Sequence, residues 1–166
     1  MLKNILSPAD CADCRICCVF DRYDLWETPT VPAEMKDALS ELDPSLEFIS
    51  KGDSFRFRME EDEDGLYYCP MLTETGCKLG DSKPVECRIW PYRVMELRGQ
   101  LVIGVASICP TMYNKPLRLL KEELDNGLAD IIFAEAKKCP DMIKDYSESY
   151  PILKIGMTVS EFFGGE

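Results

Sequence analysis

The stretch CADCRICC, residues 11–18, places four thiols within eight residues: Cys11, Cys14, Cys17 and Cys18. Two residues between successive cysteines allow a tight turn to direct both sulfurs toward one ion, and the first three cysteines repeat this step twice. Thiolate suits zinc, copper(I) and iron–sulfur clusters. Because adjacent side chains diverge, Cys18 fits a second ion or another edge of the site. The stretch therefore predicts a thiolate metal site near the start of the chain.

Five further cysteines bring the total to nine. Four of them lie in loop-like segments marked by Pro or Gly: Cys69, Cys77, Cys87 and Cys109. Chain turns at such residues can bring distant segments onto one site. The first four cysteines and these four supply eight thiolates, which suit two four-sulfur sites, or one cluster and one zinc. Cys139 ends an amphipathic helical segment, and we expect it to be a core cysteine, with replacement of one of the eight thiolates as the alternative.

The composition limits the kind of protein and the kind of site. The chain has 166 residues, of which 46% are hydrophobic, so we expect a single domain over residues 1–166 with a substantial core. The absence of histidine excludes Cys–His catalytic pairs and His-bearing zinc sites. A net charge of −11 opposes binding to nucleic acid and to anionic membranes. Basic proteins or peptides are the more compatible partners, and the sequence gives no oligomeric state.

The expected location is the cytoplasm. The first residues, MLKNILSPADC, carry one Lys and too short an apolar run for a signal peptide. No stretch approaches the roughly 20 apolar residues that a membrane helix needs. Cytosolic thiols stay reduced, so a dense cysteine pattern there indicates metal binding or catalysis rather than disulfides.

The patterning predicts an α+β fold. Small antiparallel hairpins carry cysteine-rich loops at one end, and C-terminal helices pack on the sheet. Asn114 is a candidate helix cap, and Gly127 weakens the middle of the long helical segment, so two shorter helices are an alternative to one. We expect helices at 32–42 and 116–137. Strands at 55–59 and 66–68 are expected to pair through an acidic turn, and residues 92–97 and 100–107 to form a second hairpin. The tail at 150–166 is expected to pack back on the domain or to join a partner.

Two ordered cysteine blocks resemble a known family. CADCRICC matches the CxxCxxCC signature of the YkgJ-like cysteine-cluster proteins, described as zinc- or iron-chelating domains. A second block of residues agrees with the family's pattern. Two features depart from that pattern. Lys83 stands where the family more often has Arg, and Pro110–Thr111–Met112 replaces a glycine-rich continuation after Cys109. The resemblance covers roughly residues 11–112, and the helical C-terminal extension, about 113–166, has no counterpart. The matching positions of the second block are Cys69–Pro70, Leu72, Gly76–Cys77, Lys83–Pro84, Cys87–Arg88 and Pro91.

The resemblance implies metal binding through the eight cysteines, and it leaves three functions open. The first is a cytosolic protein that holds an iron–sulfur cluster, zinc or both, and the all-cysteine ligand set favours the cluster. The second is an S-adenosylmethionine-dependent lysine methylase-like enzyme with an iron–sulfur cluster, because flagellin lysine N-methylases are a related branch. The third is a structural-zinc scaffold for protein interaction. Arg88 is a candidate donor of hydrogen bonds to thiolates, or else part of an ordinary salt bridge.

Overall fold

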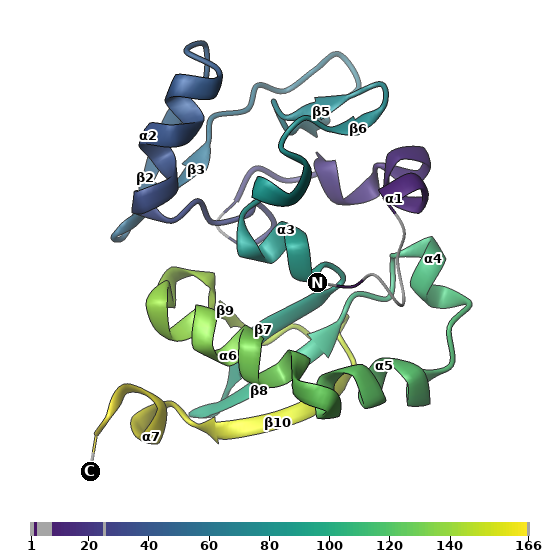
Figure 1. Ribbon diagram of the computed structural model, residues 1–166, viewed down its shortest axis with the longest axis vertical. Coiled ribbons are helices and arrows are strands. Elements are labelled where there is room, and N and C mark those ends of the chain that lie inside the picture. Colours follow the sequence, from purple (N-terminus) through teal and green to yellow (C-terminus); the bar gives the residue numbers. More distant parts are fainter. Residues whose placement is uncertain (1, 3–7, 25, 166) are drawn as a thin grey trace. The chain divides into compact units, whose positions relative to one another are not determined.

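The computed structural model describes residues 2, 8–24 and 26–165 (Figure 1). The chain divides into two compact units. We call Ser7–Arg88 the cysteine unit. We call Ile89–Glu166, together with the start of the chain, the sheet unit. The single domain expected over residues 1–166 stays a prediction.

The cysteine unit is built from short elements. Its strands form three separate antiparallel pairs, β1 with β4, β2 with β3 and β5 with β6. Short 3₁₀ turns lie at Ile16–Cys18 and Gly80–Ser82. The longer elements are α1 (Pro8–Cys14), β1 (Val19–Phe20), α2 (Ala33–Leu42), β2 (Phe48–Lys51), β3 (Ser54–Phe57), β4 (Tyr67–Tyr68), β5 (Leu72–Thr73), β6 (Gly76–Cys77) and α3 (Val85–Ile89).

The helix expected at 32–42 is confirmed as α2, with Pro32 just ahead of its first turn. Proline suits this place because its fixed φ leads into a helix and its missing N–H leaves no donor unsatisfied. Leu39 is buried, and the helix ends at Asp43, which precedes Pro44. A residue before proline is disfavoured in the helical region, so the sequence itself terminates α2.

The predicted pairing of residues 55–59 with 66–68 is wrong. β3 pairs with β2 through a two-residue turn at Gly52–Asp53, whereas β4 pairs with β1. Gly52 has a φ of 55°, which a tight hairpin of this kind requires. The acidic segment still turns sharply, because the Asp62 N–H donates to the Leu66 carbonyl at 2.9 Å. The local turn was therefore predictable, but the long-range partner of each strand was not.

A hydrophobic cluster holds these short pairs together. It draws on β1, α2, β3 and the loops around β4 and β5, and it includes the thiol of Cys69. Cys18 and Cys77 are partly buried against it. Three cysteines therefore lie at the edge of an apolar core. The buried members are Phe20, Val31, Leu39, Phe57, Met59, Cys69, Met71 and Leu79.

The sheet unit contains a four-stranded sheet with the order β10–β8–β7–β9. The predicted hairpin is confirmed as β7 paired with β8, and Arg98 and Gly99 between them both have positive φ. β10 pairs antiparallel with β8, and β9 lies parallel to β7. The elements are β7 (Tyr92–Leu97), β8 (Gln100–Val105), α4 (Pro110–Tyr113), α5 (Leu117–Glu123), α6 (Ala129–Lys138), β9 (Lys144–Asp145), β10 (Ile152–Thr158) and α7 (Val159–Phe163).

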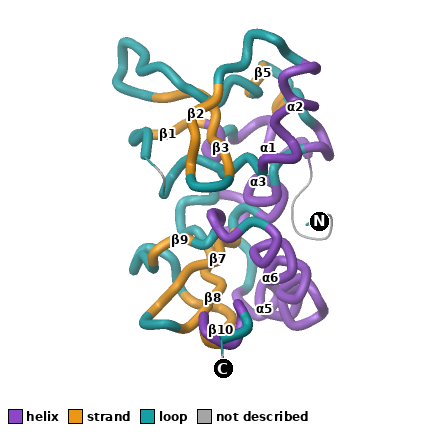
Figure 2. Tube along the Cα trace, turned by 90° about the vertical axis from the view of Figure 1, so that its left-hand side faces the viewer, coloured by secondary structure: helices purple, strands orange, loops and turns teal. Residues whose placement is uncertain are grey.

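Helices α5 and α6 lie against one face of this sheet, as Figures 1 and 2 show from perpendicular directions. Gly127, with a φ of 109°, divides the helical segment, which is the two-helix alternative. Asn114 is not the cap of α5, because it ends α4 while Pro116 precedes α5. The tail packs back on the unit, and it does so as a strand, so the extension at 113–166 is only partly helical. The α+β class and the packing of C-terminal helices on a sheet are confirmed.

Candidate metal centre

The first cysteine segment reverses direction at Arg15. This residue has a φ of 57°, in the left-handed region, and the N–H of Cys18 donates to its carbonyl at 2.9 Å. The Arg15 side chain donates from Nε to the Ala12 carbonyl at 2.9 Å and from Nη2 to the Glu74 carbonyl. Arg15 thus fixes the turn between Cys14 and Cys17. It also ties this segment to the loop of the β5–β6 hairpin, 59 residues along the chain.

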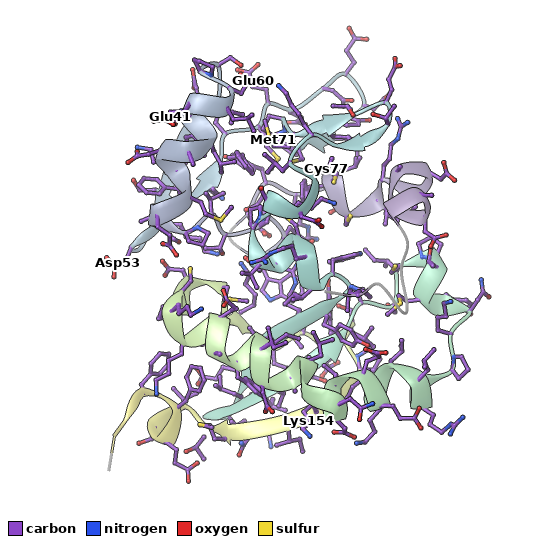
Figure 3. The ribbon with its side chains drawn as sticks, viewed as in Figure 1. Glu41, Asp53, Glu60, Met71, Cys77 and Lys154 are labelled. Atoms are coloured by element: carbon purple, nitrogen blue, oxygen red, sulfur yellow. The ribbon has the colours of Figure 1, made fainter. Side chains whose placement is uncertain are left out.

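Gly76 allows α1 to lie close to β6. Its φ is 109°, and a Cβ placed there would lie 3.2 Å from the Cβ of Ala12. That separation is too short for an undisturbed contact, so a side chain at position 76 would push α1 away. Cys77 follows directly, opposite Leu72 in the β5–β6 pair, and Figure 3 labels it beside this hairpin. The glycine before Cys77 therefore keeps the first cysteine segment near the β6 strand.

The β1–β4 pair brings together two cysteines that lie far apart in sequence. Val19 is opposite Tyr68, and the N–H of Cys69 donates to the carbonyl of Cys18 at 2.9 Å. The two thiols also share a side-chain hydrogen bond. Cys69 is only 8% exposed, and Cys18 is partly buried. Backbone pairing thus places the last thiol of CADCRICC against the first thiol of the second block.

Cys87 approaches the same thiols from α3. The helix begins directly after Pro84, whose carbonyl accepts the N–H of Cys87 at 3.0 Å. The neighbouring Glu86 is 7% exposed and accepts the N–H of Thr30 on Oε2 at 2.6 Å. This buried bond attaches α3 to the segment before α2, which fixes the position of Cys87.

The thiols raise one another's pKa values. The hydrogen bond with Cys18 and burial raise the pKa of Cys17, while the ammonium of Lys83 opposes the rise. The hydrogen bond from Cys17 lowers the pKa of Cys18, but the bond to Cys69, burial and the neighbouring thiols raise it to about 12. Burial, and then the charges of Cys18 and Cys17, raise the pKa of Cys87. Without a cation, therefore, these groups strongly disfavour carrying more than one negative charge.

Five of the eight predicted ligands thus interact with one another: Cys17, Cys18, Cys69, Cys77 and Cys87. Cys14 ends α1, the helix that lies against β6. The side chain of Cys11 lies outside the described residues. Cys109 is 5% exposed and precedes α4 in the sheet unit, where Cys139 also lies. The ligand roles of all eight cysteines stay predictions.

The thiols lie near one another without forming a metal site as they stand. Among the residues with described side chains, no group of three or more Cys, Asp or Glu residues has an arrangement that could hold a metal ion as it stands. The neighbouring thiols and burial raise the pKa values of Cys17 and Cys18. Metal binding would require the loss of the thiol protons and a closer approach of the sulfur atoms.

Sequence reasoning missed two residues that act on this cluster. Lys83 lies close enough to lower the pKa of Cys17, and Arg15 holds the first cysteine segment in place. Lys83 was visible as a basic residue in the second block, but its target was not. Arg88, the expected donor to thiolates, has a buried Nε without a hydrogen-bond partner among the described residues. Its role toward the thiols stays a prediction.

No family model, curated protein or solved structure matches the chain. Within the described part of the chain, no helix is both long enough and apolar enough to span a membrane.

Proposed function

We propose that the cysteine unit binds a metal through its thiolates in the cytoplasm, and that an iron–sulfur cluster is the favoured occupant. The observation that carries this proposal is the convergence of five cysteine thiols from four separate places in the chain. They come from the turn before β1, the residue that follows β4, strand β6 and helix α3.

A cation would resolve the electrostatic conflict in this cluster. Thiolate, not thiol, is the metal ligand, and the pKa values of Cys17, Cys18 and Cys87 are all raised in its absence. A positive metal centre offsets the mutual repulsion that raises them, and binding would release protons. Cys69 and Cys77 complete the set of thiols that would hold it. The ammonium of Lys83 would offset part of the remaining negative charge beside Cys17.

The choice between iron–sulfur and zinc rests on the sequence. Both occupants accept a site made only of cysteine, and the repeated two-residue spacing of CADCRICC is also found in iron–sulfur proteins. Zinc in a closed four-sulfur site would instead indicate a structural scaffold. No observation on the described residues favours the lysine methylase alternative.

Metal analysis of protein purified without oxygen tests the proposal. We expect stoichiometric iron and sulfide with visible absorption, or stoichiometric zinc without colour. Replacement of Cys69 or Cys77 by Ser should release most of the metal, because each removes a ligand. Cys139→Ser is the matched control, since Cys139 lies in the other unit and is expected to retain full metal content. Metal-free wild type after reconstitution, or full retention in both ligand variants, would exclude the proposed site.

A further inference from the structure

Cys18 and Cys69 come directly next to the last residue pair of the β1–β4 ladder. The register pairs Phe20 with Tyr67 and Val19 with Tyr68, and Cys18, the last residue of the 3₁₀ turn, and Cys69 follow at the next position. The hydrogen bond from the Cys69 N–H to the Cys18 carbonyl, 2.9 Å long, extends the ladder to this position. Directly opposed residues of an antiparallel pair project their side chains from the same face. The side-chain hydrogen bond between the two thiols agrees with this placement.

The backbone hydrogen bond brings these two residues near the separation that a disulfide spans. Cα atoms of a regular hydrogen-bonded antiparallel pair are about 5.5 Å apart, and Cys18 and Cys69 share one of the two bonds of such a pair, because the N–H of Cys18 donates to the Arg15 carbonyl. Disulfides join residues whose Cα atoms are roughly 4.4–6.8 Å apart. Cys17 is a poorer partner for Cys18, because the planar trans peptide between adjacent residues holds their Cβ atoms apart. Cys77 acts on Cys18 through its charge, and it belongs to a different hairpin.

We propose that Cys18 and Cys69 are a redox-active pair that forms a reversible disulfide, and that this disulfide and the bound metal exclude each other. The pair itself rests on the β1–β4 register alone. The exclusion rests on the proposed function, because it requires both sulfurs to be metal ligands. Disulfides in reduced compartments are commonly transient and redox-sensing.

A small-molecule disulfide such as oxidised glutathione serves as the oxidant. The thiolate of one cysteine attacks a glutathione sulfur, forms a mixed disulfide and displaces one glutathione thiolate. The second cysteine then attacks the protein sulfur of the mixed disulfide and displaces the other glutathione. The two protein thiols lose two protons and two electrons, and two molecules of reduced glutathione carry them away. Cys18 is the more accessible of the two sulfurs, so we expect it to form the mixed disulfide first.

Oxidation also removes two ligands at once. Each sulfur in a disulfide has lost the negative charge with which it would bind a metal. A bound metal conversely holds both thiolates and prevents their attack on an oxidant. The oxidising strength of a glutathione buffer is the concentration of oxidised glutathione divided by the square of the concentration of reduced glutathione. When free zinc is present at about 100 times its Kd, half of the protein should become oxidised only at a value of this ratio about 100 times higher.

Disulfide mapping at equilibrium tests the proposal. Reduced, metal-free protein and zinc-loaded protein are incubated with glutathione buffers at mildly alkaline pH, where thiolate attack is faster. The samples are then alkylated and digested with trypsin without reduction. Cleavage after Lys and Arg places Cys17 and Cys18 in peptide 16–22, and Cys69 and Cys77 in peptide 59–78. We expect these two peptides to be linked, with fragmentation assigning the bond to Cys18 and Cys69.

Single variants identify the bond. Cys18→Ser and Cys69→Ser should each abolish the linked peptides. Cys77→Ser should keep them and lose only the protection by zinc. Cys139→Ser, in the other unit, should change neither result. A different cysteine pair, or no linked peptide in metal-free protein, would overturn the redox pair.

The two proposals fail in different ways. If zinc binds but gives no protection, the mutual exclusion is overturned while the metal site stands. If neither zinc nor an iron–sulfur cluster binds and the Cys18–Cys69 peptides still form, the proposed function and the exclusion both fail while the redox pair is supported.

Discussion

The sheet unit and the cysteine unit achieve their order by different means. β7 and β8 pair over six residues each, and neighbouring residues on both faces are buried, including Val94, Met95 and Ile103. The strands of the cysteine unit are two to four residues long, and each belongs to a two-stranded pair. Backbone pairing is therefore continuous in one unit and interrupted in the other.

The difference indicates where a ligand matters for stability. A sheet of four strands with helices on one face can support itself, whereas an isolated two-stranded pair is marginal in water. The cysteine unit joins its pairs through one hydrophobic cluster, with thiols at the cluster's edge. A metal held by several of these segments would add the cross-links that the short ladders lack. We therefore expect metal to stabilise the cysteine unit and leave the sheet unit nearly unchanged.

The largest effect should follow metal removal. Binding of a structural metal contributes on the order of 10 kcal/mol in small zinc domains, so the cysteine unit should lose most of its amide protection when metal is removed. Residues 92–105 of the sheet unit should retain theirs. Hydrogen exchange measured by mass spectrometry before and after chelation checks both units in one experiment. Equal loss of amide protection in the two units would contradict the expectation that metal stabilises only the cysteine unit.

A core substitution in the sheet unit should have the next largest effect. Ile103 is 0% exposed in β8, and its replacement by Ala leaves a cavity. We expect Ile103→Ala to lower the free energy of unfolding of this unit by about 2–5 kcal/mol, as measured by denaturant titration. Metal content at low temperature should not change, because the candidate ligands that interact lie in the other unit. Loss of metal in this variant would show that the units are coupled.

Two glycines with the same φ allow a smaller, matched comparison. Gly76 and Gly127 both have a φ of 109°, but only Gly76 has a neighbour, Ala12, within 4 Å of an added Cβ. Gly127→Ala should cost about 1–2 kcal/mol through backbone strain alone. Gly76→Ala should cost about 1 kcal/mol more and weaken metal binding, because α1 must move away from β6. Denaturant titrations and metal-binding titrations of the two variants check this comparison. If both variants bind metal with the same affinity, Gly76 has no role in positioning the metal site.

The smallest effect should come from a surface ion pair. Lys78 Nζ lies 2.8 Å from Asp43 Oδ2, and this bond, with those from Ser45, lowers the pKa of Asp43 to about 2. A pKa that is lower in the folded state gives stabilisation above the unfolded value of 3.8, which is lost as the pH falls toward 2. Lys78→Met should raise the Asp43 pKa, as measured by NMR titration, and should hardly change stability at neutral pH. An unchanged pKa of Asp43 in this variant would contradict the ion pair between Lys78 and Asp43.

Local signals predicted much of the fold, and long-range pairing limited the rest. Arg98–Gly99 between two apolar runs was sufficient to place the β7–β8 hairpin, and Gly127 marked the break between α5 and α6. The turn at Gly52–Asp53 carries a similar hairpin signal and would have identified β2. The pairing of β1 with β4 joins segments about 50 residues apart, and nothing local in either segment specifies its partner.

The candidate site also has features that the sequence predicted and features that depend on the tertiary fold. The Pro- and Gly-marked loops and the family resemblance predicted that the first cysteines share a site with those of the second block, and in the structure Cys17 and Cys18 interact electrostatically with Cys69, Cys77 and Cys87. The sequence could not predict that Arg15 attaches the first segment to the β5–β6 loop, because that bond depends on the tertiary fold. Nor could it predict that the N–H of Cys69 donates to the carbonyl of Cys18.

The place of β10 in the sheet has a consequence for biosynthesis. β10 is synthesised after every residue of the cysteine unit, yet it pairs with β8, so the four-stranded sheet cannot close until Thr158 has been added. The cysteine unit ends at Arg88. At roughly 5–20 residues per second, the ribosome needs on the order of ten seconds to go from Arg88 to Thr158. During that interval a metal of the kind proposed would be able to reach the thiols on the nascent chain, before the sheet forms.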